Sequence, residues 1–125
     1  MPEAAVIFDA RNIVGESIIW STAEAALYWV DIVGSAIHRL DPASGAHRQW
    51  VTPELPTSIG LRRGGGFVVG LRQRVALWSP GGSFETFAVP EPDQPGNRLN
   101  EGVVAPDGSF WVGTMQDNIG ADGGP

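Results

Sequence analysis

The chain has 125 residues and a formal net charge of −6, and all eight of its basic residues are arginine. An acidic chain with scattered arginines lacks the clustered positive face that binds nucleic acid or an anionic membrane, so neither partner is expected. The absence of cysteine excludes disulfides and thiolate metal sites, and without a signal-peptide pattern or an apolar run of roughly 20 residues we expect a cytoplasmic protein with no membrane-spanning segment.

Short apolar and aromatic runs separated by glycine and proline predict an all-β chain. Turn motifs such as Pro-Asp-Gly at 106–108 and Asp-Pro-x-x-Gly at 41–45 place proline where φ is fixed and glycine where φ must be positive. No window shows a sustained helical period. Strands are expected, in chain order, at residues 6–8, then 18–20, 27–32, 36–40 and 47–51, then 59–61, 66–71, 74–78 and 84–89, and finally 103–105 and 109–114.

An internal repeat gives the strongest indication of architecture. Tyr28, Phe67 and Phe110 occupy the same place in three similar units, separated by 39 and 43 residues. This spacing is typical of a four-stranded β-propeller blade. Because a propeller needs roughly 4–8 blades to protect its sheet edges, the chain is expected to have open edges that favour self-association.

Two short motifs carry candidate chemistry. Glu16 follows a glycine at the entrance of a predicted strand, and an Asn-Arg-x-Asn turn predicted at 97–100 places Arg98 and Asn100 close together. Carboxylate and amide oxygens suit Ca²⁺, Mg²⁺, Mn²⁺ or oxygen-ligated Zn²⁺, and a guanidinium beside an amide suits a polyol or a carboxylate. Taken alone, a single glutamate at a strand end is more often a solvated residue than a metal ligand.

Other conspicuous residues are assigned structural roles. His38 lies in an apolar strand pattern and His47 in a polar region, and neither has a second ligand at metal-binding spacing in the sequence. Trp20, Trp29 and Trp111 are expected to fill the space between neighbouring blades, because large aromatic side chains bury much apolar area.

The segments 15–20, 95–102 and 106–115, in this order and spacing, resemble the N-terminal half of the gluconolactonase/regucalcin family, also called senescence marker proteins. The resemblance covers about residues 6–118. It implies a six-bladed β-propeller, of which this chain would hold about two and a half to three blades. Residues 1–125 would then be the incomplete N-terminal part of one lactonase-like domain.

The resemblance also implies roles for individual residues. Glu16 matches the family's metal ligand from the first blade, and Arg98 and Asn100 match its substrate-contacting arginine and asparagine. Asn118 stands where relatives often carry a substrate-contacting acidic residue, which is a departure from the pattern. The family's other metal ligands and its general base belong to later blades, so no catalytic residue is expected in this chain. One divalent metal (Ca, Zn, Mn or Mg) is implied, held weakly or not at all by these residues alone.

An intact relative would hydrolyse a small-molecule sugar lactone, whereas this chain is expected to be inactive as a fragment of such an enzyme. Two alternatives remain open. Two copies could associate through their open edges and rebuild an enzyme, or the chain could be a non-enzymatic interaction module that uses its exposed blade faces.

Overall fold

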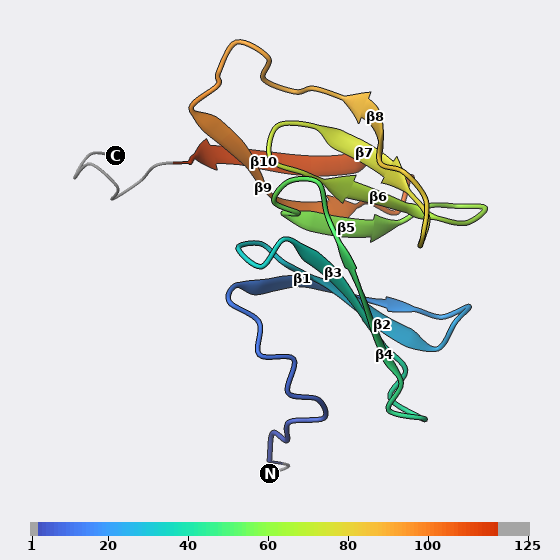
Figure 1. The fold of residues 1–125 in the computed structure, drawn as a ribbon. Helices are drawn as coiled ribbons and strands as arrows, with labels where there is room; N and C mark the ends of the chain where they lie inside the picture. Colours follow the sequence, from blue (N-terminus) through green and yellow to red (C-terminus); the bar gives the residue numbers. More distant parts are fainter. Residues whose placement is uncertain (1–2, 118–125) are drawn as a thin grey trace.

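The computed structural model describes residues 3–117, which form antiparallel β-strands joined by short turns (Figure 1). The strands of the first sheet are β1 (Gly15–Ser21), β2 (Ala26–Asp31), β3 (Ala36–Leu40) and β4 (His47–Val51). The second sheet contains β5 (Ser58–Leu61), β6 (Phe67–Gly70), β7 (Val75–Trp78) and β8 (Glu85–Ala88). The third contains β9 (Asn97–Val104) and β10 (Phe110–Gln116).

Each sheet follows the chain without a crossover, with orders β1-β2-β3-β4, β5-β6-β7-β8 and β10-β9. This pattern confirms the predicted strands of all three units and their repeat. The first strands of the sheets also lie side by side, because β5 contacts both β1 and β9 (Figure 1). No helix long and apolar enough to cross a membrane is found among residues 3–117.

The strand predicted at residues 6–8 is wrong. This segment has no strand conformation, and the Ile7 side chain is exposed. The Phe8 ring instead lies 4.4 Å from the His47 ring, against a face of the first sheet. A segment that lies on a face has no neighbouring strand with which to form a hydrogen-bonded ladder, so its apolar pattern alone does not make it a strand.

The main core lies between the first and second sheets. The repeat residues Tyr28 and Phe67 are both buried there, with their ring centroids 4.5 Å apart. Trp50 meets Trp78 edge to face at 5.4 Å, the geometry that aromatic pairs favour. A smaller core, between the second and third sheets, is formed by Val68, Val75 and Leu99 with Leu77, Ala88, Val104, Phe110 and Val112 packed against it.

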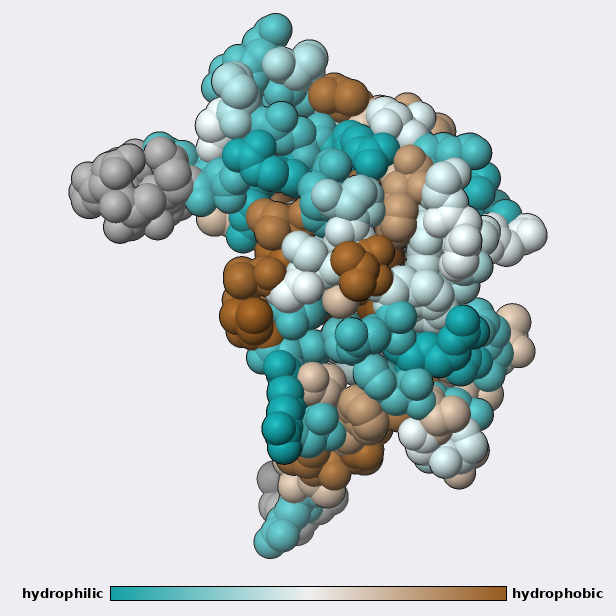
Figure 2. All heavy atoms as spheres, in the orientation of Figure 1, coloured by the Kyte–Doolittle hydropathy of each residue, from teal (hydrophilic) through white to brown (hydrophobic). Residues whose placement is uncertain are grey.

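Of the three tryptophans expected between blades, only Trp29 is buried, and it packs against Asn12 and His38 on the face of the first sheet that lies away from the second sheet. Trp29 is 9% exposed, whereas Trp20 is 47% and Trp111 is 68% exposed. Trp20 and Trp111 alternate along their strands with residues that face the two cores, so their side chains lie on the opposite faces of the first and third sheets. No described sheet covers those faces, and the prediction for these two residues is therefore wrong in this chain. Aliphatic side chains such as Ile18 and Val103 are exposed as well, and Figure 2 shows brown apolar groups at the surface.

Glycines allow β5 and β9 to approach each other closely. A Cβ added at Gly60 would lie 2.5 Å from Val104 Cγ2, and one at Gly102 would lie 2.5 Å from the Phe110 ring and 2.7 Å from Ser58 Oγ. Real Cβ atoms do not make such contacts, so a larger residue would push the strands apart. The close approach fixes the position of β9, which carries the predicted substrate-binding residues.

Candidate functional site

Glu16 lies beside an irregularity in β1. The register against β2 shifts between Glu16 and Ile19, and Ser17 adopts a positive φ of 58°. Ser17 Oγ accepts a hydrogen bond from the Ile59 N–H at 3.1 Å, which ties this distortion to β5. A β-bulge bends the strand and redirects a side chain, and here it leaves Glu16 exposed rather than packed against the core.

Asp31 holds the chain segment that leads into β1. Its carboxylate accepts hydrogen bonds from the N–H groups of Ile13 and Val14 at 2.9 Å and of Gly34 at 3.0 Å. Burial alone would raise the pKa of this carboxyl, but the hydrogen bonds from Val14, Ile13 and Gly34 outweigh it and lower the pKa below its ordinary value. Asp31 therefore stays ionised and acts as a structural anchor for the residues just before Glu16.

A cleft of about 550 Å³ opens where Glu16 lies. It is lined by residues 7–12, by 15–18 at the start of β1, and by Leu27, Trp29 and Leu40. Within residues 3–117 there is no group of three or more His, Cys, Asp or Glu side chains that could hold a metal ion. Glu16 and Asp9 are the carboxylates that line this cleft, and the described residues alone do not fit a complete site for a hard divalent cation, which takes about six or more oxygen ligands.

The turn predicted at 97–100 is wrong, because β9 already begins at Asn97 and Arg98 and Asn100 lie within it. β9 carries a register shift of its own. Leu99 pairs with Thr114 and Gly102 with Val112, so one extra residue is accommodated on the β9 side. Both predicted side chains are half-buried. Arg98 Nη1 donates to the Leu99 carbonyl oxygen at 2.9 Å. The prediction for Asn118 falls outside the described residues.

The structure brings the predicted residues to one side of the fold but not into direct contact. Glu16 is on the first strand of the first sheet, and Arg98 and Asn100 are on the first strand of the third, with β5 between these strands. Among residues 3–117, no hydrogen bond or ion pair joins Glu16 to Arg98 or Asn100. The arrangement places one carboxylate, one guanidinium and one amide on the neighbouring strands β1 and β9, with β5 between them.

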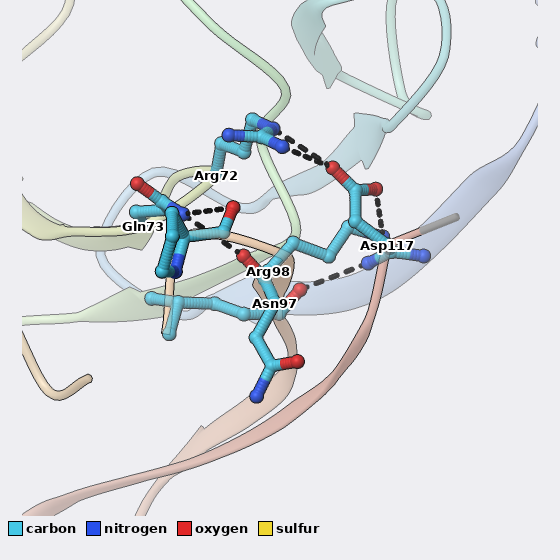
Figure 3. A network of polar contacts seen from close by, with 7 residues as sticks. Arg72, Gln73, Asn97, Arg98 and Asp117 are labelled. Carbon is cyan, nitrogen blue, oxygen red and sulfur yellow. Dashed lines mark hydrogen bonds and ion pairs between the residues drawn. The ribbon is translucent and has the colours of Figure 1, made fainter. Parts of the chain in front are cut away.

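An ion-pair network around Arg98 was not predicted (Figure 3). Asp117 Oδ1 lies 3.5 Å from Arg98 Nε, and Asp117 Oδ2 lies 2.7 Å from Arg72 Nη2. Arg72 belongs to the turn after β6, so the network links the second sheet to the third. These residues are far apart in the sequence, and no local pattern indicates that they meet.

A second polar chain that the sequence did not reveal lies on the first sheet. Trp29 Nε1 donates to Asn12 Oδ1 at 2.7 Å, Asn12 Nδ2 lies 3.1 Å from His38 Nε2, and His38 Nδ1 lies 2.9 Å from His47 Nε2. The strand register could have indicated the histidine contact, because His38 pairs with Gln49 and Leu40 with His47. This register places the two histidines diagonally on one face.

This arrangement predicts a pH dependence of stability. Burial lowers the pKa of both histidines, and the charge of His47 lowers that of His38 further, although Asp31 partly opposes this. An unfolded histidine has the ordinary pKa of 6.5, so below that pH the unfolded chain binds more protons than the folded one. The free energy of unfolding is therefore highest above pH 6.5 and decreases as the pH falls below it. We expect the melting temperature to fall between about pH 7.5 and 5.5. The double variant His38→Asn/His47→Gln should show a smaller fall, and an equal fall would contradict the assignment.

Comparisons with known proteins agree with this fold. A sequence model of the SMP-30/Gluconolactonase/LRE-like region matches residues 14–125. The chain is 38% identical over 114 residues to 6-deoxy-6-sulfogluconolactonase of Pseudomonas putida, which covers 90% of the chain and 39% of that relative. It is 39% identical over 108 residues to regucalcin of Xenopus laevis, covering 85% of the chain and 36% of regucalcin.

Solved structures give the same result. Regucalcin of Agrobacterium tumefaciens, described as a calcium-binding protein, superposes with a TM-score of 0.79 at 26% identity over 86% of the chain and 37% of that structure. A luciferin-regenerating enzyme gives 0.82 at 31% identity over 91% of the chain and 40% of that structure. The chain thus spans well under half the length of these relatives, and the predicted all-β fold, a partial β-propeller, is confirmed. By sequence and by fold, the chain belongs to the SMP-30/gluconolactonase/LRE-like family.

Proposed function

We propose that residues 1–125 form the N-terminal part of a propeller domain that hydrolyses sugar lactones with the help of a divalent metal. The observation that carries the proposal is the placement of Glu16 and of the Arg98–Asn100 pair beside register shifts on the first strands of two sheets. Such irregularities redirect side chains and are common next to active sites. Named lactonases among the relatives support the reaction class.

In this proposal Glu16 contributes one carboxylate oxygen to the metal. A bound divalent cation at such a site would polarise a lactone carbonyl and lower the pKa of a bound water. Ca²⁺, Zn²⁺, Mn²⁺ and Mg²⁺ are all consistent with an oxygen donor, and the calcium-binding description of the Agrobacterium regucalcin supports calcium among them. Because the described residues offer no group of three or more metal-binding side chains, we expect the chain by itself to bind such a cation weakly.

Arg98, Asn100 and Asn118 are proposed to bind the sugar. Arg98 offers charged N–H donors and Asn100 offers both a donor and an acceptor, a combination that suits hydroxyl groups on a ring. Their role would be to hold the lactone in one orientation, which can supply a large part of a rate enhancement. The pentonolactonase of Haloferax volcanii, 32% identical over 110 residues, and the Pseudomonas sulfogluconolactonase indicate a sugar lactone as the substrate class.

A chimera tests this function without assuming where the natural protein ends. Residues 1–125 are joined to the part of the Pseudomonas lactonase that follows its matched section, and proton release is measured on several aldonolactones with each metal and with chelator. We expect no turnover from the chain alone and metal-dependent turnover from the chimera. Glu16→Gln should lower kcat/KM of the chimera by about 100-fold or more, since even groups that only support metal ligands contribute 10–100-fold.

Glu85→Gln, which removes an exposed carboxylate of β8, is the matched control and should leave the rate unchanged. A folded chimera with no lactonase activity would refute the proposed function. An active chimera whose rate survives Glu16→Gln would refute the assignment of the metal ligand.

A further inference from the structure

The network around Arg98 is built so that one carboxylate serves two arginines. Arg72 approaches Asp117 Oδ2 with two nitrogens, Nε at 2.8 Å and Nη2 at 2.7 Å. This leaves Asp117 Oδ1 facing Arg98 Nε at 3.5 Å (Figure 3). Arg72 therefore fixes the rotation of the carboxylate, and the carboxylate in turn faces Arg98.

Backbone contacts hold the three residues in register. The Leu99 N–H donates to the Arg72 carbonyl oxygen at 2.8 Å, and the Asp117 N–H donates to the Gly96 carbonyl oxygen at 2.9 Å. Gln73 Nε2 donates to the carbonyl oxygens of Pro95 at 2.8 Å and Asn97 at 3.1 Å. Because the turn after β6, the start of β9 and the end of β10 are tied together, the ion pairs form between segments whose positions are already set.

Burial makes the pairing with Asp117 important for Arg98. The Arg98 side chain is 15% exposed and that of Asp117 is 22% exposed, whereas Arg72 is 41% exposed. Charged hydrogen-bonding groups with little water around them depend on their protein partners. Without the carboxylate, two guanidinium groups would lie close together with no anion between them, and Arg98 would turn away.

The remaining donors of Arg98 are available for a ligand. Its Nε faces Asp117 and its Nη1 donates to the Leu99 carbonyl oxygen. Within residues 3–117, Arg98 Nη2 has no hydrogen-bond or ion-pair partner. A guanidinium held at two of its nitrogens presents the third in a fixed direction, which favours a ligand that needs one oriented donor.

We propose that Asp117, itself oriented by Arg72, is a positioning residue that aims the Arg98 guanidinium at the substrate. The inference rests on the proposed function for the role of Arg98 as a substrate contact. It adds that Arg72, which follows β6 of the second sheet, helps to set the direction of this contact on the third sheet.

The positioning is tested first on the 125-residue chain, without any assay of activity. In ¹⁵N-arginine NMR spectra, hydrogen exchange of the Arg98 Nε–H should be about 10-fold faster in Asp117→Asn, because loss of the facing carboxylate lets this largely buried guanidinium turn toward water. Asp117→Glu should restore part of the protection, and Arg72→Gln should produce a smaller increase in the same direction. Asp93→Asn, which alters an exposed carboxylate in the preceding loop, should leave the exchange rate unchanged.

The functional consequence is tested in the lactonase chimera. Asp117→Asn should raise KM about 10-fold while kcat falls less than about 3-fold, because a substrate contact is lost but the reacting groups stay in place. Asp117→Glu should give an intermediate KM.

The outcomes separate the two proposals. An unchanged Arg98 exchange rate in both Asp117→Asn and Arg72→Gln overturns the positioning role, whatever the activity of the chimera. Faster exchange with an unchanged KM overturns the role in substrate binding. A folded but inactive wild-type chimera refutes the proposed function alone, since the NMR result still decides whether Asp117 orients Arg98. If Asp117→Asn does not fold, Asp117→Glu and Arg72→Gln carry the same test.

Discussion

Replacing Asp31 with alanine is expected to destabilise the chain by about 3 kcal/mol or more, which is a large part of the 5–15 kcal/mol that stabilises a typical domain. The carboxylate accepts the N–H groups of Ile13, Val14 and Gly34. Alanine would leave these donors without their partner at a buried position. Urea unfolding followed by tryptophan fluorescence measures the loss.

Two further variants separate the charge of Asp31 from its hydrogen bonds. Asp31→Asn keeps one acceptor oxygen and should lose less stability than Asp31→Ala. Asp41→Asn, in an exposed turn where the carboxylate also caps local N–H groups, is the matched control and should change stability little. If Asp31→Ala unfolds at the same urea concentration as Asp41→Asn, the anchoring role assigned to Asp31 is wrong.

The same residue predicts acid sensitivity. Because the folded pKa of Asp31 lies below the ordinary value of 3.8, its stabilisation is present above that pH and is lost as the pH falls through the lower folded value. Asp31→Asn should flatten this part of the stability profile. Loss of the anchor would also free residues 12–14, so in the chimera Asp31→Asn should reduce activity through misplacement of Glu16.

The sequence was sufficient for the fold because the signals for a propeller blade are local. Turn motifs such as 41–45 and 106–108 and alternating apolar strands repeat within each unit, and Tyr28 and Phe67 recur at one blade spacing. Each unit satisfies its backbone hydrogen bonds mostly with its own strands, so its boundaries depend little on distant residues. The repeat also predicted Glu16 at the entrance of a first strand, whereas it placed Arg98 and Asn100 in a turn, because the first strand of the third unit begins six residues earlier than its apolar run at 103–105 indicates.

The features that were missed depend on which sheets meet and on the register between strands. The pairing of both Arg98 and Arg72 with Asp117 requires the second and third sheets to approach within the distance that Gly60 and Gly102 allow. The exposure of Trp20 and Trp111 depends on which sheet faces are covered, which no local pattern reports. The register shifts beside Glu16 and Asn100 are likewise invisible in the order of residue types.

Tyr28→Ala is expected to cost about 3–5 kcal/mol, since it removes a large ring from the interface between the first two sheets. Tyr28 is 1% exposed, and its ring lies 4.5 Å from that of Phe67. The cavity would face the second sheet, so the two sheets should lose their fixed packing together. Thermal unfolding and near-ultraviolet circular dichroism measure the effect.

Tyr28→Phe isolates the contribution of the hydroxyl. This group donates to Glu24 Oε1 at 2.9 Å, and Arg39 Nε donates to the same oxygen at 3.0 Å. Burial, together with Glu24, raises the pKa of Tyr28 to about 12, so the hydroxyl remains a donor at neutral pH. Phenylalanine keeps the ring and leaves Glu24 paired with Arg39, so the loss should be only about 1 kcal/mol.

Phe87→Ala is the control for the loss of an aromatic ring, because Phe87 is 67% exposed and its removal should change stability by about 0.5 kcal/mol or less. The loss of stability should be largest for Tyr28→Ala, smaller for Tyr28→Phe and smallest for Phe87→Ala, because the buried ring contributes more than the hydrogen bond of the hydroxyl. If Tyr28→Phe were as destabilising as Tyr28→Ala, the polar cluster with Glu24 and Arg39 within the first sheet, rather than the aromatic contact between sheets, would account for the contribution of Tyr28 to stability.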